Sequence, residues 1–303
     1  MLYYLFKYWL RFCFFISTRQ VTRFQPGRFR EEGPFLIGAH HPNSFLDAIL
    51  VGTYMKRPVH FLTRSDVFRY KLVRYFLHQL KMIPVYRIRD GKDKLHLNDS
   101  SFRRSVDALK KGEHVLIFVE GFCAYQTTLQ PLKKGAARIL LQSWREGAAA
   151  RMLPLWIRYD SFWKFGKKIE LIPGAPFGAE QLDLAATDGA VLQQINRLTA
   201  TQLEELSTQQ APPPRRPAVL VPFAMAGFLL HAPLYYLYQP WVYRLMRHTI
   251  HYDSLLFCLL AISYPFWLLL VGFLAWQTLH SPLAVLVPLG MPLFLKSLML
   301  VKQ

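Results

Sequence analysis

The stretch FLIGAHHPNSFLDAILVGTYM, residues 35–55, decides the fold class of this 303-residue chain. Its first five residues, 35–39, predict a buried strand, and the apolar pattern from Ser44 onward predicts a helix. Between them stand two histidines, a proline and an asparagine. Pro42 stiffens the turn, and Asn43 or Ser44 is expected to cap the helix. The segment is therefore a strand, a polar turn and a helix in direct succession.

Strand-like and helix-like segments alternate along the first two thirds of the chain. Further strands are expected at 58–62, 82–86, 114–119, 151–159 and 168–174. Further helices are expected at 67–80, 99–112, 135–147 and 190–206. This alternation predicts an α/β fold, a mixed sheet flanked by helices.

Charge and proline content divide the chain. Residues 1–217 hold 33 of the 37 Lys and Arg and 18 of the 19 Asp and Glu, which is a net charge of +15 out of +18. The proline-rich segment QQAPPPRRPA marks a change in composition. We therefore divide the chain into an N-terminal interfacial helix, an α/β domain, a linker and a C-terminal α-helical membrane region, at 1–25, 26–210, 211–217 and 218–303.

The membrane region contains three apolar stretches. Segments 254–276 and 282–300 are each long enough to cross a hydrocarbon core of about 30 Å and are predicted to be transmembrane helices. Prolines and a histidine interrupt 218–238, which is predicted to be a hairpin. Two crossings place Arg244 and Arg247 on the side of the α/β domain, and the positive-inside tendency makes that side the cytoplasmic face.

The N-terminal segment mixes aromatic residues with Lys7 and Arg11. This composition is typical of a helix that lies at the membrane interface. A first helix packed on the α/β domain fits the sequence equally well, and the two arrangements are compatible.

A histidine followed closely by an acid is the pattern of a general base and its orienting partner, because a carboxylate on one ring nitrogen leaves the other to accept a proton. His41 and Asp47 have this pattern, at the end of a strand where open α/β sheets place their ligand sites. A second polar segment runs from Glu120 and Gly121 to the start of the helix at 135. Three cations near that helix start, Lys133, Lys134 and Arg138, predict a phosphate site. A third segment adds Arg87 to this site.

Four blocks in this order resemble the glycerophospholipid acyltransferase superfamily: HHPNSFLD (40–47), IPVYR (83–87), FVEG (118–121) with PLKKGAAR (131–138), and LPLWI (153–157). The first block is similar to that of a branch with an HPNSFLD-type motif. The resemblance covers about residues 30–175 and implies that 26–210 is an acyltransferase catalytic domain. It implies transfer of a fatty acyl group from acyl-CoA or acyl-ACP to glycerol-3-phosphate or 1-acyl-glycerol-3-phosphate in phospholipid synthesis. No cofactor beyond that co-substrate, and no metal, is expected.

Carried over by position, the resemblance makes His41 the general base and Asp47 the residue that orients it. It implies substrate binding by residues of all four blocks: Asn43, Ser44, Arg87, Glu120, Gly121, Lys133, Lys134, Arg138 and Pro154. The third block departs from the family pattern, since Val119 replaces a proline and Cys123 an arginine. Phosphate binding is then expected to depend more on Arg87 and on the cations of the second segment.

Other function classes remain to be weighed against this one. A basic nucleic-acid-binding protein would explain the charge, but no recognised DNA- or RNA-binding motif is present, and nucleic acid is not an expected partner. A metal-dependent hydrolase could use His40, His41 and Asp47, although further ligands along the chain are not evident. Transfer to another lipid alcohol, or lipid binding without catalysis, would also be consistent with a membrane protein of this kind.

Overall fold

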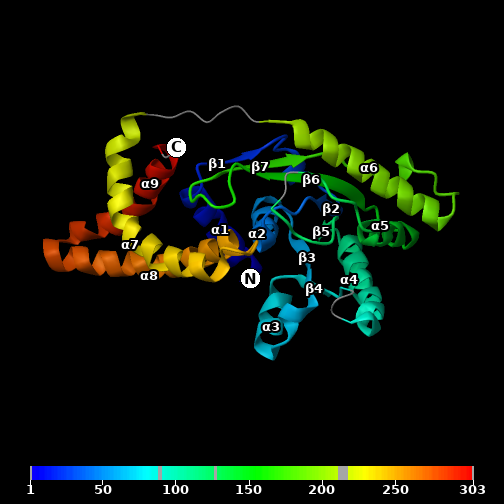
Figure 1. Cartoon of the computed structure of the whole chain (residues 1–303), viewed down its shortest axis with the longest axis horizontal. Coiled ribbons are helices and arrows are strands. Elements are labelled where there is room, and N and C mark those ends of the chain that lie inside the picture. The colour runs from blue at the N-terminus through cyan, green and yellow to red at the C-terminus, as the bar shows by residue number, and fades with distance from the viewer. Residues whose placement is uncertain (1, 88–90, 126–127, 211–217, 302–303) are drawn as a thin grey trace.

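The computed structural model describes residues 2–87, 91–125, 128–210 and 218–301. Within these residues seven strands form one sheet in the order β1-β7-β6-β2-β5-β3-β4 (Figure 1). The strands are β1 (Gln20–Arg23), β2 (Phe35–Ala39), β3 (Val59–Arg64), β4 (Met82–Val85), β5 (His114–Phe118), β6 (Arg151–Tyr159) and β7 (Lys168–Pro173). The predicted linker, 211–217, lies outside the described residues.

The sheet is mixed, as predicted. Strands β2, β3, β4, β5 and β6 run parallel to one another, whereas β7 is antiparallel to β6 and β1 is parallel to β7. The carboxyl ends of the five parallel strands therefore meet at one edge. Strand β1 was not predicted, because its four residues, QVTR, alternate too briefly to give a pattern.

Helices cover both faces of the sheet (Figure 1). They are α1 (Leu2–Ser17), α2 (Ser44–Tyr54), α3 (Lys71–Gln79), α4 (Asn98–Lys110), α5 (Gly135–Arg145) and α6 (Asp188–Thr208). Alternate residues of β2 enter different cores. Phe35, Ile37 and Ala39 pack with α1 and α2, whereas Leu36 packs with α4, α5 and α6. This alternation explains why the central strand is apolar on both sides.

Helix α1 packs on the sheet domain and also exposes aromatic side chains. Phe14 is fully buried, and the Lys7 ammonium donates to the carbonyl oxygens of Met55 and Lys56 at 2.5 and 3.0 Å, at the end of α2. Several large side chains of the same helix are exposed: Tyr4, Leu5, Phe6, Tyr8 and Phe15. The packed arrangement is therefore present, and the interfacial one stays a prediction.

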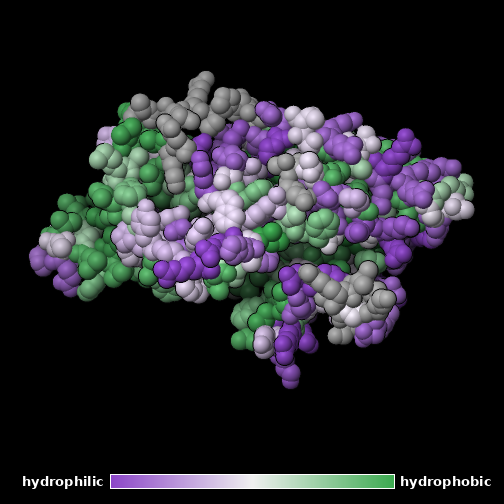
Figure 2. All heavy atoms as spheres, in the orientation of Figure 1, coloured by the Kyte–Doolittle hydropathy of each residue, from purple (hydrophilic) through white to green (hydrophobic). Residues whose placement is uncertain are grey.

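Three further helices follow residue 217: α7 (Val221–Met246), α8 (Tyr252–Leu279) and α9 (Leu286–Val301). Three helical segments of the described chain, the third counted from Pro282, are long and apolar enough to cross a membrane. Apolar side chains gather over this part of the surface, and polar ones over the sheet domain (Figure 2). The chain is thus built for membrane association.

The prediction of a hairpin at 218–238 is wrong. A single helix, α7, runs through this stretch and continues to Met246, and it bends along its length (Figure 1). Pro222 stands in its first turn, where no amide is needed, and Pro233 removes one helical hydrogen bond without ending the helix. Membrane helices tolerate such prolines because neighbouring helices pack around the break.

Candidate active site

The parallel strands bring the predicted site residues to one edge of the sheet. His40 and His41 follow β2, Arg87 comes two residues after β4, and Glu120 comes two residues after β5. Because β2 lies between β5 and β6, the histidines stand at the middle of this edge. This is the place where α/β sheets bind ligands.

His41 and Asp47 form a hydrogen-bonded pair, as predicted from their spacing. Nδ1 of His41 lies 2.9 Å from Oδ2 of Asp47, and the imidazole stacks on the ring of Phe118 with centroids 3.5 Å apart. The Asp47 side chain is fully buried, whereas that of His41 is 15% exposed. No residue in the described part of the chain hydrogen-bonds Nε2 of His41. The pair therefore presents one ring nitrogen for proton transfer while the carboxylate fixes the other.

Two further donors hold the Asp47 carboxylate. The backbone amide of Asn43 donates to Oδ2 at 2.7 Å, and the hydroxyl of Tyr159 donates to Oδ1 at 2.7 Å. Burial raises the pKa of Tyr159 well above its usual range, and the Asp47 carboxylate adds to this shift. The phenol therefore remains a donor throughout the working pH range.

His40 is part of a different pair. Its Nδ1 lies 3.2 Å from both oxygens of Glu120, and its ring stacks on Trp156 with centroids 4.0 Å apart. Glu120 also accepts from the backbone amides of His41 at 3.1 Å and Gln130 at 2.8 Å. Burial raises the pKa of this carboxyl, but the hydrogen bonds from His40 and the two amides outweigh it and lower the pKa overall. Glu120 thus ties the β2 turn to the loop after β5.

Cys123 stands beside the pair, and its sulfur accepts from the Ser44 amide at 2.9 Å. Burial, aided by the charge of Asp47, raises the pKa of the Cys123 thiol to about 12. Three potential metal-ligand atoms, one each from His41, Asp47 and Cys123, lie within 4.8 Å of one another. This spacing is close enough to hold a metal ion. The carboxylate is already engaged by three donors of the protein, and the thiol resists deprotonation, so this donor set fits an ion poorly.

The predicted phosphate-binding cations lie at the same edge of the sheet. Arg87 and Arg64 both contact the carboxylate of Asp66, at 3.4 and 2.5 Å. Gly121 has a φ of +73°, and a Cβ there would come within 2.9 Å of Cγ of Lys133. The glycine therefore allows the Lys133 stem to pack against the turn after β5.

The remaining predicted residues have the following positions. Lys134 and Arg138 are exposed, just before and within the first turn of α5. Pro154 is buried inside β6, where it pairs with Gly38 of β2. Asn43 and Ser44 are both buried. Substrate binding by these residues stays a prediction.

The predicted side-chain cap of α2 is absent. Asn43 occupies the capping position, but its side chain accepts no hydrogen bond from the first turn of the helix. The amide of Ser44 donates to Cys123, and the amide of Leu46 donates at 3.2 Å to Oγ of Ser254, on α8. Partners from distant segments therefore replace the local cap.

Sequence reasoning missed Tyr159 and the residues at the start of α8. Tyr159 ends β6, and its place on the strand next to β2 was the available signal. His251, Asp253 and Ser254 reach the site from the membrane region, 207 to 211 residues away from their partners. No motif in the sequence links these positions.

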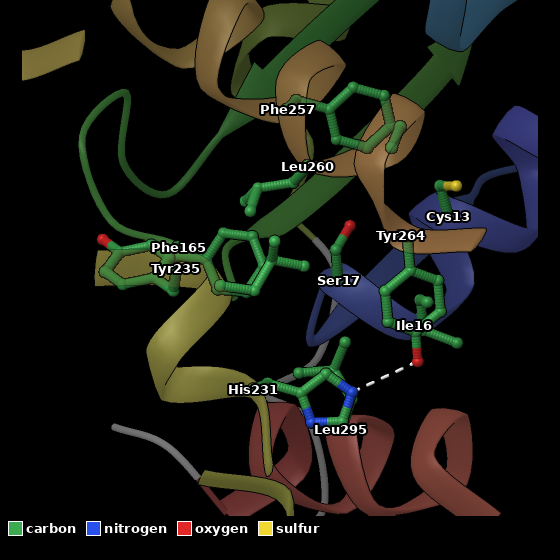
Figure 3. A pocket seen from close by; sticks show the side chains of 12 residues that line it. Cys13, Ile16, Ser17, Phe165, His231, Tyr235, Phe257, Leu260, Tyr264 and Leu295 are labelled. Carbon is green, nitrogen blue, oxygen red and sulfur yellow. Dashed lines mark hydrogen bonds between the residues drawn. The ribbon is translucent and has the colours of Figure 1, made fainter. Parts of the chain in front are cut away.

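A separate cavity of about 50 Å³ lies between α1, α7, α8 and α9 (Figure 3). Its lining is apolar apart from a few groups, among them His231, whose Nδ1 lies 2.8 Å from the Gly227 carbonyl and whose Nε2 lies 3.2 Å from the Tyr264 hydroxyl. Both ring nitrogens are thus satisfied, as a polar group between membrane helices requires. The cavity is not part of the histidine site.

Comparison with known proteins identifies the enzyme class to which the site belongs. Residues 20–158 match the model of the family described as Acyltransferase. These residues form an acyltransferase domain. The matched acyltransferase segment contains both histidines, Asp47, Arg87 and Glu120, and it ends one residue before Tyr159. The predicted enzyme class is therefore confirmed.

The crystal structure of the 1-acyl-sn-glycerophosphate (LPA) acyltransferase PlsC from Thermotoga maritima is similar to this acyltransferase. The two are 15% identical, with a TM-score of 0.49, over 69% of this chain and 81% of the other. No protein among the curated ones matches the chain by sequence.

Proposed function

We propose that this acyltransferase is a membrane-bound O-acyltransferase of phospholipid synthesis. It takes a fatty acyl group from acyl-CoA or acyl-ACP and transfers it to the hydroxyl of glycerol-3-phosphate or 1-acyl-glycerol-3-phosphate. The observation that carries this proposal is the His41–Asp47 pair at 2.9 Å, with one imidazole nitrogen presented at the edge of the sheet. A thioester is already activated, so a positioned hydroxyl and one base suffice for its attack.

The geometry of the pair supports the following reaction. Nε2 of His41 takes the proton of the acceptor hydroxyl as the oxygen attacks the thioester carbonyl, forming a tetrahedral oxyanion. Collapse of this intermediate breaks the carbon–sulfur bond, and the imidazolium returns its proton to the departing thiolate. Asp47, held by Tyr159 and by the Asn43 amide, stabilises the imidazolium and keeps the ring in one tautomer.

The cations of the site support an acceptor with a phosphate group. Arg64 ends β3, Arg87 comes two residues after the neighbouring β4, and Lys133 packs against the turn after β5, so three strand ends contribute positive charge. Arginine and lysine side chains recognise phosphate through charge-assisted hydrogen bonds. The basic surface also favours anionic lipid headgroups and the acyl donors.

The contacts of α8 and α9 support two membrane crossings by this pair of helices, and the positive-inside tendency supports the cytoplasmic face for the catalytic domain. Helix α8 starts at the catalytic loop, through His251 and Asp253. In α9, the Lys296 ammonium donates to the carbonyls of Thr18 and Arg19 at 2.9 and 3.2 Å, so the chain returns to the end of α1. Both ends of the α8–α9 pair thus contact the same domain.

Acyl transfer by the purified, detergent-solubilised protein tests the proposal. Acyl-CoA and acyl-ACP are each offered with glycerol-3-phosphate and with lysophosphatidate, for the wild type, His41→Ala and the control His248→Ala, an exposed histidine of the α7–α8 turn. Loss of general-base help lowers kcat about 100-fold or more in His41→Ala. His248→Ala is expected to keep wild-type turnover. EDTA is expected to leave the rates of the wild type and of His248→Ala unchanged.

Turnover of His41→Ala at the wild-type rate would refute the mechanism. Sensitivity of the wild type to EDTA, restored by added metal, would instead favour the hydrolase class and the cluster of His41, Asp47 and Cys123. A folded wild type that acylates neither acceptor would move the assignment to another lipid alcohol or to lipid binding.

A further inference from the structure

The start of α8 is hydrogen-bonded to the catalytic loop, residues 40–47. Oγ of Ser254 donates to the carbonyl of Asn43 at 3.1 Å and accepts from the amide of Leu46 at 3.2 Å. The Asn43 side-chain amide donates to Oδ2 of Asp253 at 2.5 Å. One residue pair of α8 therefore engages the backbone and the side chain of this loop.

These contacts are closed to solvent. Asn43 and Ser254 have no exposed surface, and Asp253 is 8% exposed. The charge of Asp253 is balanced by the ammonium of Lys167, with which it forms an ion pair. A buried charge that is paired and hydrogen-bonded holds its partners in one geometry, since breaking any contact leaves a desolvated group.

The rim of the same contact is formed by His251. Its Nδ1 lies 2.5 Å from Oγ of Ser44. Burial lowers the pKa of His251, and the nearby charge of Arg64 lowers it further. The ring therefore stays neutral near pH 7, and its Nδ1 can accept a hydrogen bond from the Ser44 hydroxyl.

The catalytic loop needs support of this kind. Ser44 has a φ of +52°, a left-handed conformation that is strained for a residue with a side chain. It opens α2, whose first turn has no side-chain cap from Asn43. The Ser254 hydroxyl supplies what a cap normally supplies, an acceptor for an amide of the first turn. Leu46, which donates that hydrogen bond, directly precedes Asp47.

We propose that the start of α8 positions the catalytic pair, with Ser254 as the central positioning residue and Asp253 and His251 as its supports. This inference rests on the proposed function. The three residues act through the backbone of 43–46 on Asp47 and hence on His41, and they do not touch the reacting atoms. They lie outside the matched family segment, 20–158, so the membrane region of this chain completes its own active site.

Steady-state kinetics of Ser254→Ala test the inference, with Ser263→Ala as the matched control. Ser263 is on the same helix, and its hydroxyl donates within that helix, to the carbonyl of Leu259 at 2.6 Å. Loss of the Ser254 hydroxyl lowers kcat about tenfold, as expected for one buried hydrogen bond, and leaves KM for the acyl donor within about twofold. Ser263→Ala changes neither parameter.

A double-mutant cycle distinguishes positioning from a general loss of structure. Because Ser254 acts through His41, Ser254→Ala reduces the residual turnover of His41→Ala by less than about twofold. An equal tenfold loss in both backgrounds overturns the inference, and so does a Ser254→Ala enzyme that matches Ser263→Ala. If Ser254→Ala aggregates, the comparison of His251→Ala with His248→Ala, both in the turn before α8, decides the question by the same kcat criterion.

The outcomes separate the inference from the proposed function. Wild-type turnover that does not depend on His41 refutes the proposed function, and the positioning role falls with it. Turnover that depends on His41 but not on Ser254 or His251 refutes the inference alone.

Discussion

Replacement of Tyr159 by phenylalanine removes one hydroxyl and leaves the rest of the site in place. Phenylalanine fills the same volume, so the change creates no cavity, and the ring still faces Lys167, whose ammonium lies 5.9 Å from its centroid. What is lost is the donor to Oδ1 of Asp47 at 2.7 Å. The carboxylate is fully buried, so water does not replace this donor without rearrangement.

A hydrogen bond to a buried charged group is worth about 1.5–3 kcal/mol. If the whole of this loss appears in the transition state, where the imidazolium depends on Asp47, kcat falls about 10- to 160-fold. Any part of the loss that is already present in the resting enzyme lowers the melting temperature instead, by about 2–4 °C per kcal/mol. Transfer of a radiolabelled acyl group gives kcat, and thermal unfolding in detergent gives the melting temperature.

The control is Tyr75→Phe, because Tyr75 is 59% exposed on α3. It is expected to match the wild type in both measurements. A Tyr159→Phe enzyme whose kcat stays within about twofold of the wild type would refute the reasoning. It would mean that the Asn43 amide and the imidazole hold Asp47 without help from β6.

Two further predictions concern side chains with displaced pKa values. Because burial raises the pKa of the Cys123 thiol to about 12, iodoacetamide at pH 8 should label it far more slowly than a free thiol. Cys123→Ser, which keeps an acceptor for the Ser44 amide, should retain kcat within about threefold; a loss near that of His41→Ala would favour an acyl-enzyme. Burial, with smaller effects of Arg57 and Lys7, lowers the pKa of His114 to about 4. A lowered histidine pKa stabilises the fold above the unfolded value, near 6.5, so stability should fall by about 3 kcal/mol between pH 6.5 and pH 4. Thermal unfolding between pH 6.5 and pH 4 measures this pH dependence of stability. His114→Asn, which keeps an acceptor for the Phe35 amide, should flatten the pH dependence. An unchanged slope in the variant would contradict the prediction.

The sequence was sufficient for features set by short-range patterns. Strand β2, the turn and α2 follow one another directly, so the pairing of His41 with Asp47, six residues apart, was predictable from local geometry. Phe35, Ile37 and Ala39 alternate with residues of the opposite face, which indicated a central strand. The apolar length of α8 similarly indicated a membrane helix, because hydropathy depends on composition alone.

Local patterns failed where neighbouring structure outweighed them. The prolines of 218–238 suggested a hairpin, but α7 continues through them because packing of the adjacent helices stabilises the bend. Asn43 has the chemistry of a helix cap, yet its side chain donates to Asp253 instead. In each case a partner distant in sequence competes with the local preference and wins.

What only the tertiary structure decided is how the catalytic pair is held. Tyr159 lies 112 residues from Asp47, and Ser254 lies 208 residues from Leu46. Periodicity fixes which face of an element is buried but not which distant side chain meets it, because that depends on strand order and helix packing. The sequence alone thus determined the fold class, the long apolar helices α8 and α9 and the pairing of His41 with Asp47, whereas the contacts that fix their geometry exist only once the sheet and α8 have come together.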